Sequence, residues 1–130
     1  MPHVVFDKKI DLVEFSKKFQ PVIKRDCGII KLNNVFVDKN NDKALITSLT
    51  IDNDLHQEFI IEIDAKVNSS TLRLFPMTDP KKTSSVKTAL GLLANFVLCV
   101  FPNARIVKTN IPEFIEKNIP NYEIEKSYSI

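Results

Sequence analysis

The sequence predicts an α+β protein, a two-layer sandwich with the element order β-α-β-β-β-α-β and a mixed sheet that carries two helices on one face. Two segments of the 130-residue chain, 11–20 and 83–101, have apolar residues at helical spacing. Between them, apolar and polar residues alternate through much of 31–67, which is typical of strands with one buried face. The length suffices for one domain with its own core, so we expect a single domain over residues 1–130.

The first predicted elements are a short strand at His3–Phe6 and a helix that begins after Asp11. Asp11 with Glu14 three residues later matches a capping box, in which both side chains bond the backbone of the first helical turn. Pro21 should end this helix near Gln20, because proline lacks the N–H that a helix needs. The apolar residues at helical spacing here are Leu12, Phe15, Phe19, Val22 and Ile23.

Three strands are predicted next, at 32–37, 43–51 and 59–67, with turns rich in Asn and Asp between them. The last strand has the clearest alternation. Glu62 and Asp64 face the side opposite to its apolar residues, and we expect that side to be solvated or to meet another subunit. The apolar residues that share the buried side are Phe59, Ile61, Ile63, Ala65 and Val67.

The second half of the chain predicts a long connection at 68–85, with room for a short strand at 72–75, and then a helix at 83–101. That helix is apolar nearly all round, so more than its sheet side must be covered. Either an oligomer or the C-terminal segment could cover it. A last strand is expected at 105–108, and we expect 109–130 to form an extension, with an arm over a neighbouring subunit as one alternative.

Composition excludes several function classes. The net charge is only +2, from 18 basic and 16 acidic side chains, so neither nucleic acid nor a membrane surface is an expected partner. Gly28 and Gly91 are the only glycines, which rules out a phosphate-binding glycine loop. Two cysteines and two histidines lack zinc-site spacing, so we expect no metal and no cofactor. The longest apolar run, 89–101, is too short to span a bilayer, and no leader is recognisable; we therefore expect a cytoplasmic protein.

The opening "MPHVVF", followed by a helix, alternating strands and a long apolar helix, resembles the tautomerase superfamily, especially its 5-carboxymethyl-2-hydroxymuconate isomerase branch. The similarity covers residues 2–108 in layout, and "MPHVVF" is its one sharp match. The resemblance implies a homotrimer that needs no cofactor. It also implies an N-terminal proline that moves a proton on a small carboxylated enol or dienol.

The chemistry of such a site would depend on Pro2. Removal of Met1 would leave a secondary amine, and an ordinary α-amino group has a pKa of about 7.7–8. Burial and nearby cations would lower that pKa, so the amine would be a neutral base near pH 7. The family branch holds the substrate carboxylate with arginines, but no arginine lies between residues 26 and 72. The substrate-binding candidates are therefore Arg73, Lys39, Lys43 and His3.

Two function classes remain open. The first is a cofactor-free tautomerase or isomerase with Pro2 as its catalytic base. The second is a non-catalytic oligomeric α+β module that binds a small ligand or a protein partner through its sheet. In both cases we expect a homo-oligomer, with a trimer favoured by the resemblance.

Overall fold

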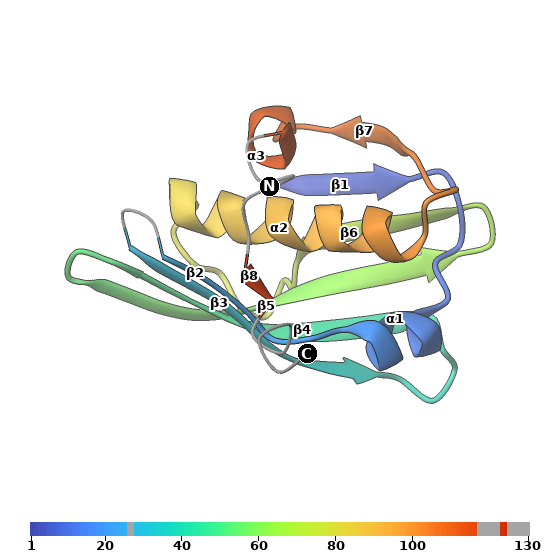
Figure 1. Cartoon of the computed structure of the whole chain (residues 1–130), viewed down its shortest axis with the longest axis horizontal. Coiled ribbons are helices and arrows are strands. Elements are labelled where there is room, and N and C mark those ends of the chain that lie inside the picture. The colour runs from blue at the N-terminus through green and yellow to red at the C-terminus, as the bar shows by residue number, and fades with distance from the viewer. Residues whose placement is uncertain (26–27, 117–122, 125–130) are drawn as a thin grey trace.

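The computed structural model describes residues 1–25, 28–116 and 123–124, and its main feature is one sheet that curls around a central helix (Figure 1). The predicted extension 109–130 is therefore described only in part. The elements are β1 (His3–Phe6), α1 (Leu12–Lys18), β2 (Val22–Arg25), β3 (Ile29–Val37), β4 (Lys43–Asp52), β5 (Leu55–Lys66), β6 (Ser69–Leu74), α2 (Ser84–Val100), β7 (Ile106–Thr109), α3 (Pro112–Glu116) and β8 (Glu123–Ile124).

The eight strands form one sheet in the order β7-β1-β6-β5-β4-β3-β2-β8, and every neighbouring pair is antiparallel. The predicted β-α-β-β-β-α-β sandwich with a mixed sheet is therefore wrong. In that arrangement a helix would connect parallel strands. Here β1 instead lies antiparallel to β6, with His3 opposite Arg73, and β2 to β6 follow one another as a meander.

Two strands account for the difference: β2, which the prediction lacked, and β6, for which it left room only as a short strand at 72–75 in a long connection. The helix at 12–18 ends before Pro21, because Phe19 is already extended with ψ at 136°. Val22, which continues the helical spacing in the sequence, instead begins β2. Strand β6 is longer than the short strand allowed for at 72–75. It returns directly along β5 after a turn at 67–68, so it is no part of a long connection.

The predicted starts of both helices are confirmed. Asp11 Oδ1 accepts a hydrogen bond from the backbone N–H of Glu14 at 3.2 Å, as expected of an N-cap. The helix predicted at 83–101 is α2, and the Thr83 side chain caps it by accepting from the Val86 N–H. In β5 the predicted buried side is correct for four of its five residues, but the strand ends at Lys66, and Val67, predicted on that side, is 80% exposed. The inward residues Phe59, Ile61, Ile63 and Ala65 are all buried.

Helix α2 is covered on several sides, which accounts for its nearly continuous apolar surface. It contacts β3, β4 and β6 on the inner side of the sheet, and in Figure 1 it runs between β1 and the β4–β3–β2 part. Its Phe96 ring packs against the rings of Phe15 and Phe19 in and after α1. On another side α3 lies so close that a Cβ on Gly91 would meet the carbonyl oxygen of Phe114 at 2.3 Å. Part of the C-terminal segment thus covers α2.

Candidate binding site on the outer face of the sheet

The side of the sheet that faces away from α2, called the outer face below, is the surface left for binding. Helices α1 and α2 both contact β3 from the inner side and α3 packs on α2, so the helices described here leave the outer face uncovered. Several large apolar side chains of this face are only half-buried or are exposed. They are Ile29, Phe36, Leu45, Leu49, Ile51, Ile60 and Phe75.

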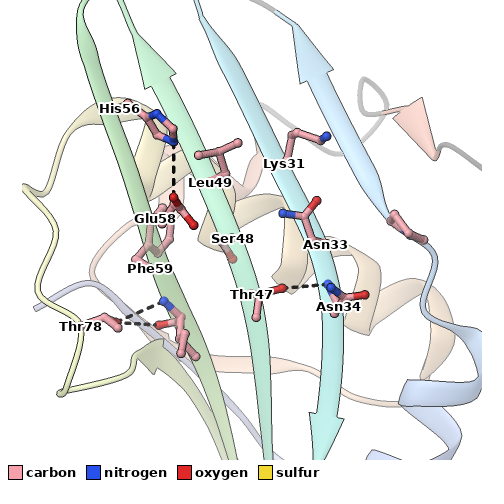
Figure 2. A pocket seen from close by; sticks show the side chains of 12 residues that line it. Lys31, Asn33, Asn34, Thr47, Ser48, Leu49, His56, Glu58, Phe59 and Thr78 are labelled. Atoms are coloured by element: carbon pink, nitrogen blue, oxygen red, sulfur yellow. Dashed lines mark hydrogen bonds and ion pairs between the residues drawn. The ribbon is translucent and has the colours of Figure 1, made fainter.

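A groove of about 890 Å³ crosses the outer face over β3, β4 and β5. Figure 2 shows the residues that line it, of which Ser48 and Phe59 are buried and belong to the inner side of the sheet. The strand register arranges the residues at the base of the groove in rows across the sheet. One row runs Lys31–Leu49–Glu58 across the three strands, so Leu49 lies between a lysine and a glutamate. Neighbouring strands are 4.7–4.9 Å apart, which puts the α-carbons of Lys31 and Glu58 about 10 Å from each other. The groove therefore has an apolar centre with opposite charges on its two sides.

A β-bulge in β3 supplies the amides of the groove. Leu32 pairs with Ser48 and Asn34 with Thr47, so Asn33 is an extra residue that has no paired residue on β4. A bulge bends its strand and redirects side chains, and the side chains of Asn33 and Asn34 both lie on the groove side in Figure 2. The backbone N–H of Asn34 donates to Thr47 Oγ1 at 3.0 Å, which fixes the bulge to β4.

The segment after β6 forms the wall of the groove beside β5. Thr78 Oγ1 accepts from the Ile60 N–H at 3.2 Å and donates to the carbonyl of Phe75 at 3.0 Å. Further along, the Gln57 side chain accepts from the Lys81 N–H at 2.7 Å and donates to its carbonyl at 3.2 Å. These bonds hold the segment against β5, so the wall has a defined position.

Histidine and carboxylate side chains also meet in the groove. His56 Nε2 lies 3.8 Å from Glu58 Oε2, which is an ion-pair distance when the ring is protonated. Both side chains are exposed, at 57% and 81%, so water screens the pair strongly. Such a solvated pair suits ligand recognition better than proton transfer in a dry site. In the part of the chain that the structure describes, no three His, Cys, Asp or Glu side chains are grouped to hold a metal ion.

Two of the residues predicted to hold a substrate carboxylate do converge on a carboxylate, but it belongs to this chain. Arg73 Nε donates to Glu62 Oε1 at 2.9 Å, and Lys43 Nζ lies 3.9 Å from Glu62 Oε2. Arg73 Nη2 also lies 3.7 Å from Asp64 Oδ2. Glu62 is only 3% exposed although it belongs to the outer face. The positive charges of Arg73 and Lys43 are thus largely matched by neighbouring carboxylates.

The other predicted site residues are dispersed. Lys39 is exposed in the turn after β3. His3 lies beside Arg73 by strand register, and its Nδ1 is 3.0 Å from the carbonyl oxygen of Met1. Pro2 is buried and lines a separate hollow of about 250 Å³ together with Lys82 and Lys87. Neither Arg73 nor Lys43 is among the residues that line this hollow.

The groove residues were missed because the sequence prediction treated 32–37 as a regular strand. Two successive asparagines, Asn33 and Asn34, inside that strand were the available signal, since asparagine is depleted in regular strands and marks irregular backbone. His56, which also lines the groove, lies in β5.

No protein-family model matches the chain, and no curated protein or solved structure is detectably similar to it. The resemblance to the tautomerase superfamily therefore stays a prediction from the sequence. Among the described residues no helix has both the length and the apolar character needed to cross a membrane.

Proposed function

We propose that this protein is a non-catalytic binding module that takes a small ligand in the groove of its outer face. The observation that carries the proposal is the bulge at Asn33, which directs two amides into a groove on the uncovered side of the sheet. The apolar side chains left accessible on that side also favour binding there. The predicted cytoplasmic location is kept as part of the proposal.

The arrangement of the groove indicates the kind of ligand. Lys31 would bind an anionic end and Glu58 a cationic end, while Leu49 would contact an apolar middle. The amides of Asn33 and Asn34 offer both donors and acceptors to polar groups between the two ends. A short zwitterionic molecule with an aliphatic centre, such as a tripeptide, has this chemistry.

The proposal can be tested with the tripeptide Gly-Leu-Gly and NMR signals of the backbone amides. We expect saturable shifts confined to β3, β4 and β5, and weaker binding of the acetylated and amidated peptide, which lacks both end charges. Asn33→Ala should weaken binding about two- to tenfold, the effect of one or two lost hydrogen bonds. Asn103→Ala, an exposed asparagine after α2, is the matched control and should leave the affinity unchanged.

Two results would contradict the proposal. One is equal binding of the charged and the capped peptide, or no saturable shift in these strands. The other is a dimer or trimer by light scattering that dissociates when Leu49 is replaced by Asp. In that case the outer face would be the subunit interface of the predicted homo-oligomer, with a second copy as its occupant.

A second candidate function is proton transfer by Pro2 on a small carboxylated enol, and the observation that favours it is the pair Lys82 and Lys87 beside Pro2. If Met1 is removed, two cations would lower the pKa of the proline amine and attract a substrate carboxylate. With Met1 attached the proline nitrogen is an amide and no base. The carbonyl of Met1 then accepts from Asn110 Nδ2 at 3.0 Å.

Intact-mass measurement and an enol-to-keto assay decide this candidate. We expect the mass of the chain without Met1, and ketonisation of 2-hydroxymuconate or phenylpyruvate that falls about 100-fold or more in Pro2→Ala. Lys87→Gln should raise KM, because it removes one cation from the hollow. A retained Met1, or equal rates for wild type and Pro2→Ala, would rule the candidate out.

A further inference from the structure

A second hollow lies on the outer face, toward the β3–β4 turn, and its lining combines aromatic rings with carboxylates. It has a volume of about 290 Å³, and it is lined by Phe36, Val37, Asp38, Lys43, Leu45, Glu62 and Phe75. We call it the Phe36–Phe75 pocket. Its floor follows the strand register, because Phe36 lies opposite Leu45 and Leu45 opposite Glu62. Phe75 stays tied to β5 through its N–H, which donates to the carbonyl of Ile60 at 2.8 Å.

The buried carboxylate of Glu62 is the unusual feature of this pocket. Its Oε1 accepts the hydrogen bond from Arg73. Its Oε2 faces Lys43 Nζ at 3.9 Å, which is beyond hydrogen-bond distance, and the Lys43 side chain is 51% exposed. A carboxylate oxygen in an apolar setting gains much from a closer cation. Lys43 can move into solvent, because its side chain is half exposed and Arg73 would still bond the other oxygen of Glu62.

A second carboxylate keeps the pocket negative. The backbone N–H of Asp42 donates to Asp38 Oδ1 at 3.0 Å and holds the pKa of Asp38 below its usual range. The N–H of Lys43 adds a second bond at 3.3 Å. Asp38 therefore stays ionised at neutral pH. Together with Arg73, which bonds Glu62 and also lies 3.7 Å from Asp64, the pocket and its immediate surroundings hold three carboxylates against two cations. That balance favours a cation over an anion.

The aromatic rings narrow the choice of cation. Phe36 is 60% exposed and Phe75 is half-buried across the pocket, so both rings are accessible to a ligand. The faces of aromatic rings attract organic cations, and they suit an ammonium group that carries alkyl substituents, whose hydration is weak. A metal ion would instead need several oxygen ligands in place of the rings.

We propose that the Phe36–Phe75 pocket binds an alkyl- or methylammonium group, which takes the place of Lys43 Nζ beside Glu62. The group could belong to a free small molecule or to a methylated lysine side chain of a peptide, and the chemistry of recognition is the same in both. This proposal does not rest on ligand binding in the groove, because it uses other residues and other probes.

The test is titration of the intact protein with choline and with 3,3-dimethylbutanol, its uncharged analogue of the same shape, followed by NMR and calorimetry. We expect choline to shift the signals of Phe36, Leu45, Glu62 and Phe75, and to bind at least about tenfold more tightly than the alcohol. A short peptide with trimethyllysine is the second arm. Tighter binding of the peptide would identify a side chain as the source, and tighter binding of choline would identify a free molecule.

Three variants separate recognition from structural effects. Phe36→Leu keeps an apolar, exposed side chain without a ring, and we expect it to weaken choline binding about fivefold. Lys43→Gln removes the internal competitor and should tighten binding severalfold, which a purely structural role of Lys43 would not produce. Val67→Ala alters an exposed apolar residue elsewhere and should change nothing. The proposal is overturned if the alcohol binds as well as choline, or if Phe36→Leu and Lys43→Gln both leave the affinity unchanged.

Discussion

Replacing Ile61 with Ala is expected to destabilise the protein by about 2–5 kcal/mol, the largest single effect we anticipate. Ile61 is fully buried at the middle of β5, and its neighbours in register, Ile46 and Leu74, are fully buried as well. The close-packed inner side cannot collapse into the space of the lost methyl and methylene groups, so a cavity remains. Chemical denaturation measures the loss, and the midpoint of thermal unfolding should fall by roughly 10 °C.

The adjacent residue provides the matched control. Ile60 has the same side chain on the same strand but points to the outer face, where it is half-buried. Ile60→Ala should therefore cost about 1 kcal/mol or less, since a partly exposed side chain loses less burial and leaves no closed cavity. Equal losses for the two variants would mean that the outer face is covered as fully as the inner face.

The features that could be predicted from the sequence are the ones that depend on neighbouring residues. The cap at Asp11 and the alternation in 59–65 were correct because a helix start and a strand face are set within a few residues. Strand β2 was missed because the prediction relied on local spacing there too. Val22 continues a helical spacing, and the proline before it was taken as the end of the helix without a following strand.

The sheet order could not be predicted from local pattern. The pairing of β1 with β6 joins residues about 70 positions apart, and nothing within either strand specifies that partner. A helix between two strands favours a parallel crossover, which led to the wrong sandwich. Here α1 spans seven residues and packs with α2, and the chain then enters a meander instead.

The surroundings of the candidate site residues could not be predicted from local pattern either. The alternation placed Glu62 on the correct face, but the expectation that it would be solvated was wrong; contact with another subunit stays a prediction. Its burial comes from side chains of other strands, among them Leu45 and Arg73 on its two sides. Of the four residues expected at a carboxylate site, Arg73 and Lys43 do meet at one carboxylate, and it is Glu62 of this chain.

The second large expected effect concerns the ion pair of Glu62 and Arg73. Replacing Arg73 should lower the free energy of unfolding by more than replacing Glu62 does. The Glu62 side chain is 4% exposed, whereas that of Arg73 is 36% exposed. Arg73→Met would leave a buried carboxylate with only the distant Lys43 as a partner, and we expect a loss of about 2–3 kcal/mol in the free energy of unfolding. Glu62→Leu should cost less, about 1 kcal/mol, because Arg73 can still reach Asp64 and water.

The double variant Glu62→Leu with Arg73→Met completes the cycle. Because both charges are gone and the replacements are apolar and of similar length, we expect stability close to that of the Glu62→Leu variant, well above that of Arg73→Met alone. Urea denaturation of the four proteins measures the coupling, which should approach about 2 kcal/mol. If the two single losses simply add, the hydrogen bond at 2.9 Å contributes nothing beyond its separate side chains, and Glu62 must be solvated when Arg73 is absent. The same result would weaken the ammonium proposal, since that proposal needs a carboxylate held away from water.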